Sequence, residues 1–494
     1  MLLDGDSGWS ELYCSLKKGL VKVTDIKKGE IYKWDEKKKL WLEVDKAVIV
    51  ADIQQTILEQ AKYCYGKKKK SELKKIVQLA KKVKPAKEAF ELVKVKLLDE
   101  EFVSLINSKV DELPIAKGKL IKLRTGVVRD RTQSDYFTFS LDVSYVNNKK
   151  GLEVNDKVLN FIMDICNGDK DLYNYLQELL GLCLTGINER QLYICWGDGN
   201  NGKTTLFGLL ANVLKGYAGS LPDGALMNGE GRRSKDSATL ALNPIKGKKF
   251  VMCDESGDQD KLDTSLIKRL ANEEGTISLR ENYGDFTEEK IQCKAFLATN
   301  KIPNFDHTDE AVVKRLRFIP FNARFFDPSK ESDRLKLAEG KSNYKVANKD
   351  LVKEIKTKYL DDFFSWLVEG CIRYFDRGSI HEPKLIFQTT KNVTFDKDSV
   401  KRFMTSCIAL SEDDITSDTI FQCDSEATGP EWRTSKDSIY REYFTYVKDV
   451  CGGLAETKAI FYKRLVGLGV KEVMVRGQRC FKLKRVIEEE EQDV

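Results

Sequence analysis

Histidine is nearly absent from the sequence, with only His307 and His381 among 494 residues. Because imidazole is the commonest general base and a frequent zinc ligand, this shortage argues against histidine-based catalysis. Twelve cysteines are present, but no two have the Cys-x-x-Cys spacing of a zinc site. They are scattered singly, and some, such as Cys195 and Cys253, lie in apolar runs, which is typical of reduced, buried thiols.

A long apolar run is also missing. No stretch contains the roughly 18 uninterrupted apolar residues that a transmembrane helix needs. Residues 1–9 include two aspartates and no basic residue, which is the reverse of a secretory leader. The composition, with 41% hydrophobic and 32% charged residues, is that of a soluble globular protein. We therefore expect a cytoplasmic protein without a membrane partner.

Charge is distributed unevenly along the chain. The formal net charge is +6, yet residues 61–98 contain thirteen lysines and only three glutamates. This stretch is either a solvated, lysine-rich helical face or a contact surface for nucleic acid. The last residues, by contrast, are acidic and have the composition of a disordered tail.

The apolar pattern divides the chain into regions. Short apolar strands at 192–196, 250–253 and 295–299, separated by helical stretches, predict a parallel α/β sheet. Ahead of them, a strand-like opening near residues 30–44 is followed by helical patterns. The expected regions are a mostly helical N-terminal region (1–185), an α/β core (186–325), a helical region (326–410), a polar linker (411–435), a compact C-terminal unit (436–485) and an acidic tail (486–494).

The strongest motif is Gly197-Asp-Gly-Asn-Asn-Gly202-Lys203-Thr204, which fits the pattern Gly-x4-Gly-Lys-Ser/Thr. It lies between an apolar strand and a helical run, the context in which glycines let backbone N–H groups surround phosphate oxygens. We expect Lys203 to reach the β- and γ-phosphates of ATP and Thr204 to bind Mg²⁺. The predicted ATP-binding residues of this loop are Gly197, Gly199, Asn201, Gly202, Lys203, Thr204 and Thr205.

A pair of carboxylates follows the next predicted core strand. Asp254 and Glu255 come directly after the apolar residues 250–253, fifty-one residues beyond Lys203 in the case of Asp254. At the end of a buried strand downstream of a phosphate-binding loop, two such carboxylates have different tasks. Asp254 is expected to hold Mg²⁺ and so to take part in ATP binding, and Glu255 to orient and deprotonate the attacking water.

Two further polar positions complete the predicted catalytic set. Asn300 follows the strand at 295–299, where its amide can contact the γ-phosphate and the attacking water. Arg315 precedes the apolar residues 318–321 and can reach the γ-phosphate bound to an adjacent subunit as an arginine finger. Arg317 is a second candidate for the finger, and a surface basic cluster is the alternative interpretation of both arginines.

This set of motifs resembles the superfamily 3 helicases, a branch of the AAA+ ring ATPases, and in particular the poxvirus-type and phage-type primase-helicases. The segments Ala298-Thr-Asn300-Lys-Ile-Pro303, Thr308-Asp-Glu-Ala311 and Arg315-Leu-Arg317-Phe-Ile-Pro-Phe321 are the most similar. Asp135-Tyr-Phe-Thr138 is similar to the family's lead-in region, and the resemblance covers about residues 110–485.

The resemblance implies a fold, an activity and a set of partners. It implies an α/β fold with an AAA+ P-loop core and parallel sheet, a helical N-terminal region and a C-terminal winged-helix domain. It further implies a homo-hexamer that binds ATP and Mg²⁺ between subunits and unwinds single-stranded or forked DNA during viral or phage replication, with 3′ to 5′ direction. The host cytoplasm is then the expected location.

The family's DNA-contacting loop is expected between residues 266 and 294. Lys268, Arg280 and Tyr283 fall at matching places, but the usual Gly-Gly-Asp is replaced by Asn272-Glu-Glu-Gly275, and the hairpin is rather acidic. Relatives often carry a primase domain ahead of the helicase. The sequence shows no sign of one, so a primase is expected on another polypeptide or on a longer form of this protein, together with other replication factors as partners.

The compact C-terminal unit is a second candidate for DNA binding. Two helical patterns followed by an alternating, hairpin-like segment predict a winged helix. Docking of a partner protein is the alternative role for such a unit. The candidate DNA contacts are Lys458, Lys463, Arg464, Arg476 and Arg479.

Two other functions remain open on the sequence alone. One is a P-loop NTPase motor or remodeller without unwinding activity, such as a genome-packaging motor. The other is a DNA-binding initiator that uses ATP only to assemble. A complete set of Glu255, Asn300 and Arg315 favours hydrolysis over the initiator.

Overall fold

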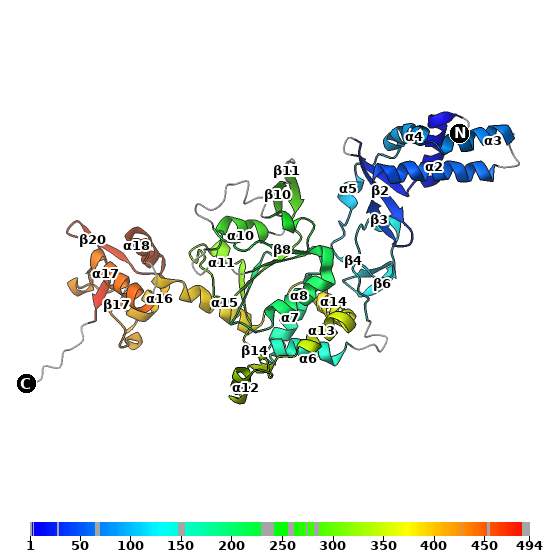
Figure 1. Cartoon of the computed structure of the whole chain (residues 1–494). Coiled ribbons are helices and arrows are strands. Elements are labelled where there is room, and N and C mark those ends of the chain that lie inside the picture. Colours follow the sequence, from blue (N-terminus) through cyan, green and yellow to red (C-terminus); the bar gives the residue numbers. More distant parts are fainter. Residues whose placement is uncertain are drawn as a thin grey trace, which may run out of the picture.

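The computed structural model places three units in a row (Figure 1). An N-terminal unit and a C-terminal unit lie at opposite ends, and the α/β core lies between them. Within the described part of the chain, no helix is both long and apolar enough to cross a membrane. The structure describes residues 2, 4–26, 29–64, 70–146, 154–228, 242–254, 261–272, 275–280, 286–424, 426–451 and 455–486.

A five-stranded parallel sheet forms the centre of the core. Its strand order is β13-β7-β12-β9-β8, so the predicted parallel α/β sheet is confirmed. The three strands expected from the sequence are β7, β9 and β12, and the two edge strands were not anticipated. The bounds are β7 (Leu192–Trp196), β8 (Ala218–Leu221), β9 (Phe250–Cys253), β12 (Lys294–Thr299) and β13 (Leu316–Pro320).

Both faces of this sheet are covered by apolar side chains, which explains why its strands are apolar without alternation. Within β12, Phe296 belongs to one hydrophobic cluster and Leu297 to the other. The first cluster contains residues of α8 (Lys203–Leu214), α7 (Lys170–Leu182) and α14 (Leu360–Arg377). The second contains residues of α10 (Thr264–Leu270), and Val393 of α15 (Lys384–Asp396) also belongs to it.

Two glycines let α7 and α14 cross in direct backbone contact. A Cβ at Gly370 would lie 2.0 Å from the carbonyl oxygen of Gln177, and one at Gly181 would lie 2.4 Å from that of Leu367. Gln177 also donates to the Trp366 carbonyl oxygen over 2.8 Å. Any side chain at either glycine must therefore push the two helices apart.

Gly370→Ala is expected to destabilise the protein by about 1–3 kcal/mol, because the methyl group overpacks this crossing. In an unobstructed helix the same change stabilises by up to about 1 kcal/mol. Gly467→Ala is the matched control, since a Cβ at helical Gly467 meets nothing within 4 Å. Thermal unfolding of both variants gives the measurement, and a Gly370→Ala protein as stable as the control would contradict the close crossing.

The N-terminal region is mostly helical, as the sequence predicted, but it also holds two antiparallel three-stranded sheets. Only the first sheet was predicted, from the strand-like segment near residues 30–44. Strands of four residues in the second sheet are too short to give a clear alternating pattern. The elements are α1 (Gly5–Lys17), β1 (Val21–Asp25), β2 (Glu30–Asp35), β3 (Leu40–Glu43), α2 (Lys46–Tyr63), α3 (Lys70–Ala80), α4 (Val83–Lys96), α5 (Phe102–Leu105), β4 (Glu112–Ile115), β5 (Lys119–Lys122), β6 (Val127–Asp130) and α6 (Asp156–Ile165).

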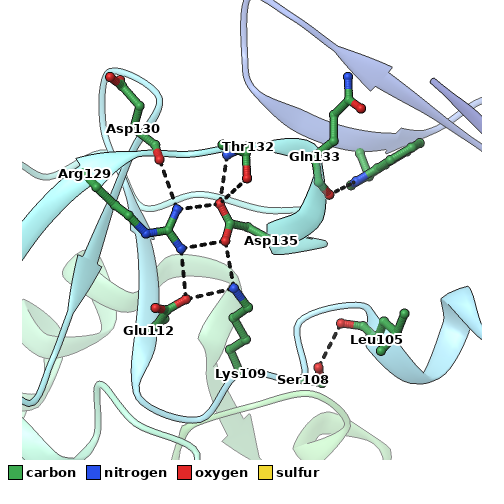
Figure 2. A network of polar contacts seen from close by, with 10 residues as sticks. Leu105, Ser108, Lys109, Glu112, Arg129, Asp130, Thr132, Gln133 and Asp135 are labelled. Carbon is green, nitrogen blue, oxygen red and sulfur yellow. Dashed lines mark hydrogen bonds and ion pairs between the residues drawn. The ribbon is translucent and has the colours of Figure 1, made fainter. Parts of the chain in front are cut away.

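A buried carboxylate ties the second sheet to the segment that follows it (Figure 2). Arg129 of β6 donates to both oxygens of Asp135 over 2.8 and 2.6 Å, and Lys109 donates over 2.7 Å. Asp135 is only 3% exposed. Burial opposes its ionisation, but the hydrogen bonds from Arg129, Lys109 and the Thr132 backbone outweigh it and hold the pKa of Asp135 well below its usual range.

Asp135→Asn is expected to cost about 3 kcal/mol of stability at neutral pH, because it removes the buried one of the two carboxylates that Lys109 and Arg129 share and leaves them only Glu112. Since the folded-state pKa is depressed, the contribution of Asp135 is complete above the unfolded pKa of about 4 and is lost as the pH falls further. Thermal unfolding from neutral to acidic pH tests this. Asp130→Asn is the control, since Asp130 lies nearby but is exposed; equal unfolding temperatures of the two variants would refute the structural role.

The C-terminal unit contains the two helices and the hairpin that the sequence predicted. The hairpin of β19 and β20 turns at Arg476 and Gly477, both with positive φ. The unit also takes in more of the chain than expected. Its elements are α16 (Ser399–Cys407), β16 (Ile408–Ala409), β17 (Phe421–Cys423), β18 (Thr434–Ser435), α17 (Lys436–Tyr446), α18 (Lys458–Gly467), β19 (Glu472–Val475), β20 (Gln478–Phe481) and β21 (Leu483–Arg485).

Residues 411–435 do not run free as the expected linker. Within this range β17 pairs with β21, and Phe421 is fully buried. Phe403 of α16 packs against Tyr443 and Phe461 of the following helices. The compact unit therefore begins near Ser399 and not at 436.

Candidate nucleotide-binding site

The phosphate-binding loop joins the carboxyl end of β7 to the start of α8. Gly202 has φ of 84° and Gly197 φ of 150°, and a Cβ at Gly197 would lie 2.3 Å from the Phe321 carbonyl oxygen. Asn200, with φ of 60°, is held by the Phe325 backbone N–H, which donates to its carbonyl oxygen over 2.7 Å. The glycines thus permit a turn that ends with the N–H groups of α8 facing the loop.

Lys203 lies at the base of this loop. It is 6% exposed, and its Nζ donates to the carbonyl oxygens of Gly197 over 2.7 Å and of Thr299 over 3.1 Å. It also lies 3.5 Å from Oδ1 of Asn300. The loop lysine and the residue at the end of β12 therefore meet, although 97 positions separate them in the sequence.

The parallel sheet brings the other predicted groups to the same edge. Thr299 pairs with Trp196, and Cys253 pairs with Leu297, so Asn300 and Asp254 both follow strands that end beside the loop. Thr204 and Asp254 line one cavity of about 420 Å³, together with Phe207 and Gly208. A hydroxyl and a carboxylate oxygen are the hard ligands that Mg²⁺ prefers, so these two residues can hold it. Glu255 lies outside the described residues.

The remaining loop residues differ in their environment. Asn201 is 3% exposed, and its Oδ1 accepts from the Lys203 backbone N–H over 3.3 Å. A Cβ at Gly199 would meet nothing within 4 Å, so the loop is open at this point. Thr205 is half-buried in the first turn of α8. Asn201 therefore stabilises the loop from inside the protein, whereas Gly199 lies on the side of the loop that is open to solvent.

Arg315 lies at the opposite end of the sheet from the loop of its own chain. Leu316, the next residue, pairs with Leu192 at the start of β7. A five-residue strand is about 16 Å long, which separates Arg315 from the loop. Its Nε donates to the Ala271 carbonyl oxygen over 3.0 Å and its Nη1 to that of Ala311 over 2.7 Å. Such an arginine can serve a nucleotide only in another subunit.

Arg317, the second candidate for the finger, is held within its own chain. Its Nε lies 2.9 Å from Oε1 of Glu382, and its Nη1 donates to the Leu316 carbonyl oxygen over 2.9 Å. An ion pair within the chain must be broken before this guanidinium can turn to a neighbour. Both arginines are thus held within the chain, Arg315 by two carbonyl oxygens and Arg317 by a carboxylate, which is the stronger restraint.

One arginine beside the loop was not anticipated. Arg324 of β14 (Arg324–Phe326) forms an ion pair of 3.2 Å with Asp198 in the phosphate-binding loop. β14 pairs with β15 (Tyr344–Val346), and both follow the last strand of the core. The only signal in the sequence was a basic residue shortly after an apolar strand, which is too common to single out.

The expected DNA loop of the core is a β-hairpin, built from β10 (Thr276–Arg280) and β11 (Phe286–Lys290). It projects from the core in Figure 1. Arg280 ends the first strand opposite Phe286, whereas Tyr283 lies outside the described residues. Lys268, in α10, is paired with Asp309, so this candidate is engaged within the chain.

The candidates in the C-terminal unit fall into two groups. Lys463, Arg476 and Arg479 are exposed, and Arg479 forms an ion pair of 3.6 Å with Glu472. Lys458 is exposed as well, but it donates to Oδ1 of Asp437 over 2.5 Å. Exposed cations of α18 and the hairpin thus remain candidates for phosphate contacts.

Arg464 requires a correction, because its side chain is largely buried and does not face solvent. It forms an ion pair with Asp398, which is 1% exposed, and its Nη1 lies 3.4 Å from Nε2 of His307. His307 follows Asn300 in the core, and burial lowers its pKa. Arg464 therefore joins the C-terminal unit to the core instead of binding DNA.

Comparisons with known proteins point in one direction. A family model described as "Family of unknown function (DUF5906)" matches residues 195–315. "Putative helicase L207/L206" of Acanthamoeba polyphaga mimivirus is 29% identical over 54% of this chain and 27% of its own length. "Putative helicase 184R" of Invertebrate iridescent virus 6 is 24% identical over 60% of this chain and 31% of its own length. "Primase D5" of Fowlpox virus is 24% identical over 41% of this chain and 24% of its own length.

The chain therefore spans about a quarter to a third of the length of these relatives. Among solved structures, the C-terminal region of NrS-1 covers 96% of this chain with a TM-score of 0.47 and 13% identity. The relatives are viral proteins, and their names attach helicase or primase activity to them. Because so much of each relative has no counterpart here, the activity of a whole relative cannot be transferred to this chain unchanged.

Proposed function

Because this chain is related to viral helicases and primase-helicases of superfamily 3, we propose that it is an ATP-driven DNA helicase motor that acts in genome replication. Its P-loop core is of the AAA+ type, and its C-terminal unit is a winged helix. The observation that carries the proposal is the meeting of Lys203 with Asn300 at the edge where Asp254 and Thr204 also lie. A loop lysine, a hydroxyl, a carboxylate and an amide placed together in this way are the groups that bind and hydrolyse a nucleoside triphosphate.

Each group has a role in the proposed hydrolysis. Lys203 leaves its carbonyl partners and binds the β- and γ-phosphates, while Thr204 and Asp254 would hold Mg²⁺, which would neutralise charge on the phosphates. Glu255 takes the proton of the attacking water, and Asn300 orients that water. Arg315 approaches from the next subunit and stabilises the charge of the transition state.

The position of Arg315 supports a ring, and a homo-hexamer is the assembly we propose. In a closed ring every interface is the same head-to-tail contact, so each nucleotide has a loop on one side and a finger on the other. One DNA strand would pass through the ring with 3′ to 5′ direction. The hairpin of β10 and β11 and the exposed cations of the C-terminal unit are the proposed DNA contacts.

A strand-displacement assay tests the function directly. With Mg²⁺ and ATP, we expect the protein to separate a forked duplex, and to require a single-stranded tail of one polarity. Hydrolysis without strand displacement on either polarity would favour a packaging motor or remodeller. DNA binding that depends on ATP but not on its hydrolysis would favour an initiator.

A further inference from the structure

The N-terminal unit carries a concentration of positive charge that the nucleotide site does not use. The 27 residues from Lys70 to Lys96 contain nine lysines and three glutamates, so their formal charge of +6 equals that of the whole chain. They form α3 and α4, which lie at the end of the molecule away from the C-terminal unit (Figure 1). This charge is therefore well separated from the proposed ATPase.

Five of these lysines form an exposed surface, which we call the lysine face. Its members are Lys74, Lys75, Lys81, Lys82 and Lys87. In the part of the chain that the structure describes, none of the five forms an ion pair, whereas Lys84 pairs with Glu88 and Lys94 with Glu91. The acidic residues of these helices thus leave the face unneutralised.

The scaffold beneath the face is fixed. Leu73 and Ile76 are buried in the hydrophobic cluster of the unit, so the opposite side of α3 turns its lysines outward. Gln54 of α2 donates to the carbonyl oxygens of Ala80 and Lys82 over 2.9 and 3.1 Å and holds the turn between α3 and α4. Like charges gathered on one surface repel one another and destabilise the compact state. Among the described residues, these five lysines form no ion pair that would stabilise the fold.

We propose that the lysine face binds the phosphate backbone of nucleic acid without regard to sequence. Lys74 and Lys81 are seven residues apart, which is about 10 Å along a helix, and strand phosphates recur about every 3.4 Å along duplex DNA. The face can therefore contact several phosphates at once. No arginine occurs in residues 1–123, so the bidentate side chain best suited to reading bases is missing from α3 and α4.

Such a surface would hold DNA that extends beyond the ATPase core. Its binding needs no nucleotide, so it goes beyond the proposed helicase function and can fail or succeed separately from it. An acidic membrane surface would also attract lysines. The apolar side chains of α3 and α4 that remain exposed beside the face, such as Leu79 and Val83, include none of the aromatic residues that anchor a protein at a bilayer surface. Leu73 and Ile76, by contrast, are buried in the unit's own core. Nucleic acid is the occupant that this arrangement favours.

The test is the salt dependence of DNA binding by the full chain without nucleotide. Fluorescence anisotropy with a labelled oligothymidylate would compare the wild type with a variant carrying Lys74→Gln, Lys75→Gln, Lys81→Gln and Lys82→Gln. If all four lysines contact phosphates, the slope of log affinity against log salt becomes less steep by about 2.8. Glutamine keeps the helix propensity, so folding is preserved.

A charge-matched control removes four exposed lysines elsewhere, at Lys330, Lys353, Lys356 and Lys391. We expect its slope to remain that of the wild type, and basal ATPase activity to be unchanged in both variants. Equal slopes in the wild type and the lysine-face variant would overturn the proposal, as would an equal loss in variant and control. Loss of binding to anionic vesicles with DNA binding retained would assign the face to a membrane and also overturn it.

Discussion

Lys203→Ala is expected to lower ATPase activity by about a hundredfold to a thousandfold, the usual loss when one charged donor to the transition state is removed. It should also weaken nucleotide binding, because Lys203 is the cation at the base of the loop and lies beside Asn300. Phosphate release and the binding of a fluorescent ATP analogue measure the two effects separately. A Lys203→Ala enzyme with unchanged activity would remove the loop from the reaction.

Glu255→Gln separates binding from chemistry in the same site. The substitution removes the proposed base but leaves the loop and Lys203 in place, so hydrolysis should be lost while the ATP analogue still binds. Thermal unfolding of Lys203→Ala and Glu255→Gln is the control that tests whether each variant is still folded. Full turnover by Glu255→Gln would withdraw the catalytic role of this carboxylate.

The parts of the nucleotide site that the sequence revealed are those with local signals. A glycine-rich loop between an apolar strand and a helix identifies Lys203 and Thr204 without any knowledge of the fold. The strands at 250–253 and 295–299 are continuous apolar runs because both faces of the sheet are buried, and this places Asp254 and Asn300 at one edge. Residues that are far apart in the sequence meet there because the carboxyl ends of parallel strands lie at the same edge of the sheet.

Features that depend on distant partners were not predictable in this way. Arg464 has the appearance of a DNA contact on a basic helix, but its partner Asp398 lies 66 positions earlier and buries it. Arg324 becomes part of the candidate site only because the fold places β14 beside Asp198 of the loop. Likewise Phe421 lies in a polar stretch, and it belongs to the core because β17 pairs with both β16 and β21. In each case the decisive contact is absent from the local sequence.

Mixing two inactive variants should restore hydrolysis if Arg315 acts across an interface. Arg315→Ala alone should lose most activity, because removal of an arginine finger costs about a thousandfold or more. Lys203→Ala should be inactive for the reason given above. In a mixed ring, however, an intact Lys203 in one subunit can meet an intact Arg315 from its neighbour, and about a quarter of the interfaces satisfy both conditions at equal concentrations.

The expected result is therefore a mixture more active than either variant alone, with at most about a quarter of wild-type activity if the sites are independent. Complementation is expected because Arg315 lies at the amino end of β13, whereas the loop of its own chain lies at the carboxyl end of β7. Activity in a sedimenting monomer, or a full-rate Arg315→Ala enzyme, would contradict the trans arrangement and direct attention to Arg317. If Arg315 only caps the carbonyl groups of Ala271 and Ala311, its loss should cost about 1 kcal/mol of stability and leave the rate unchanged.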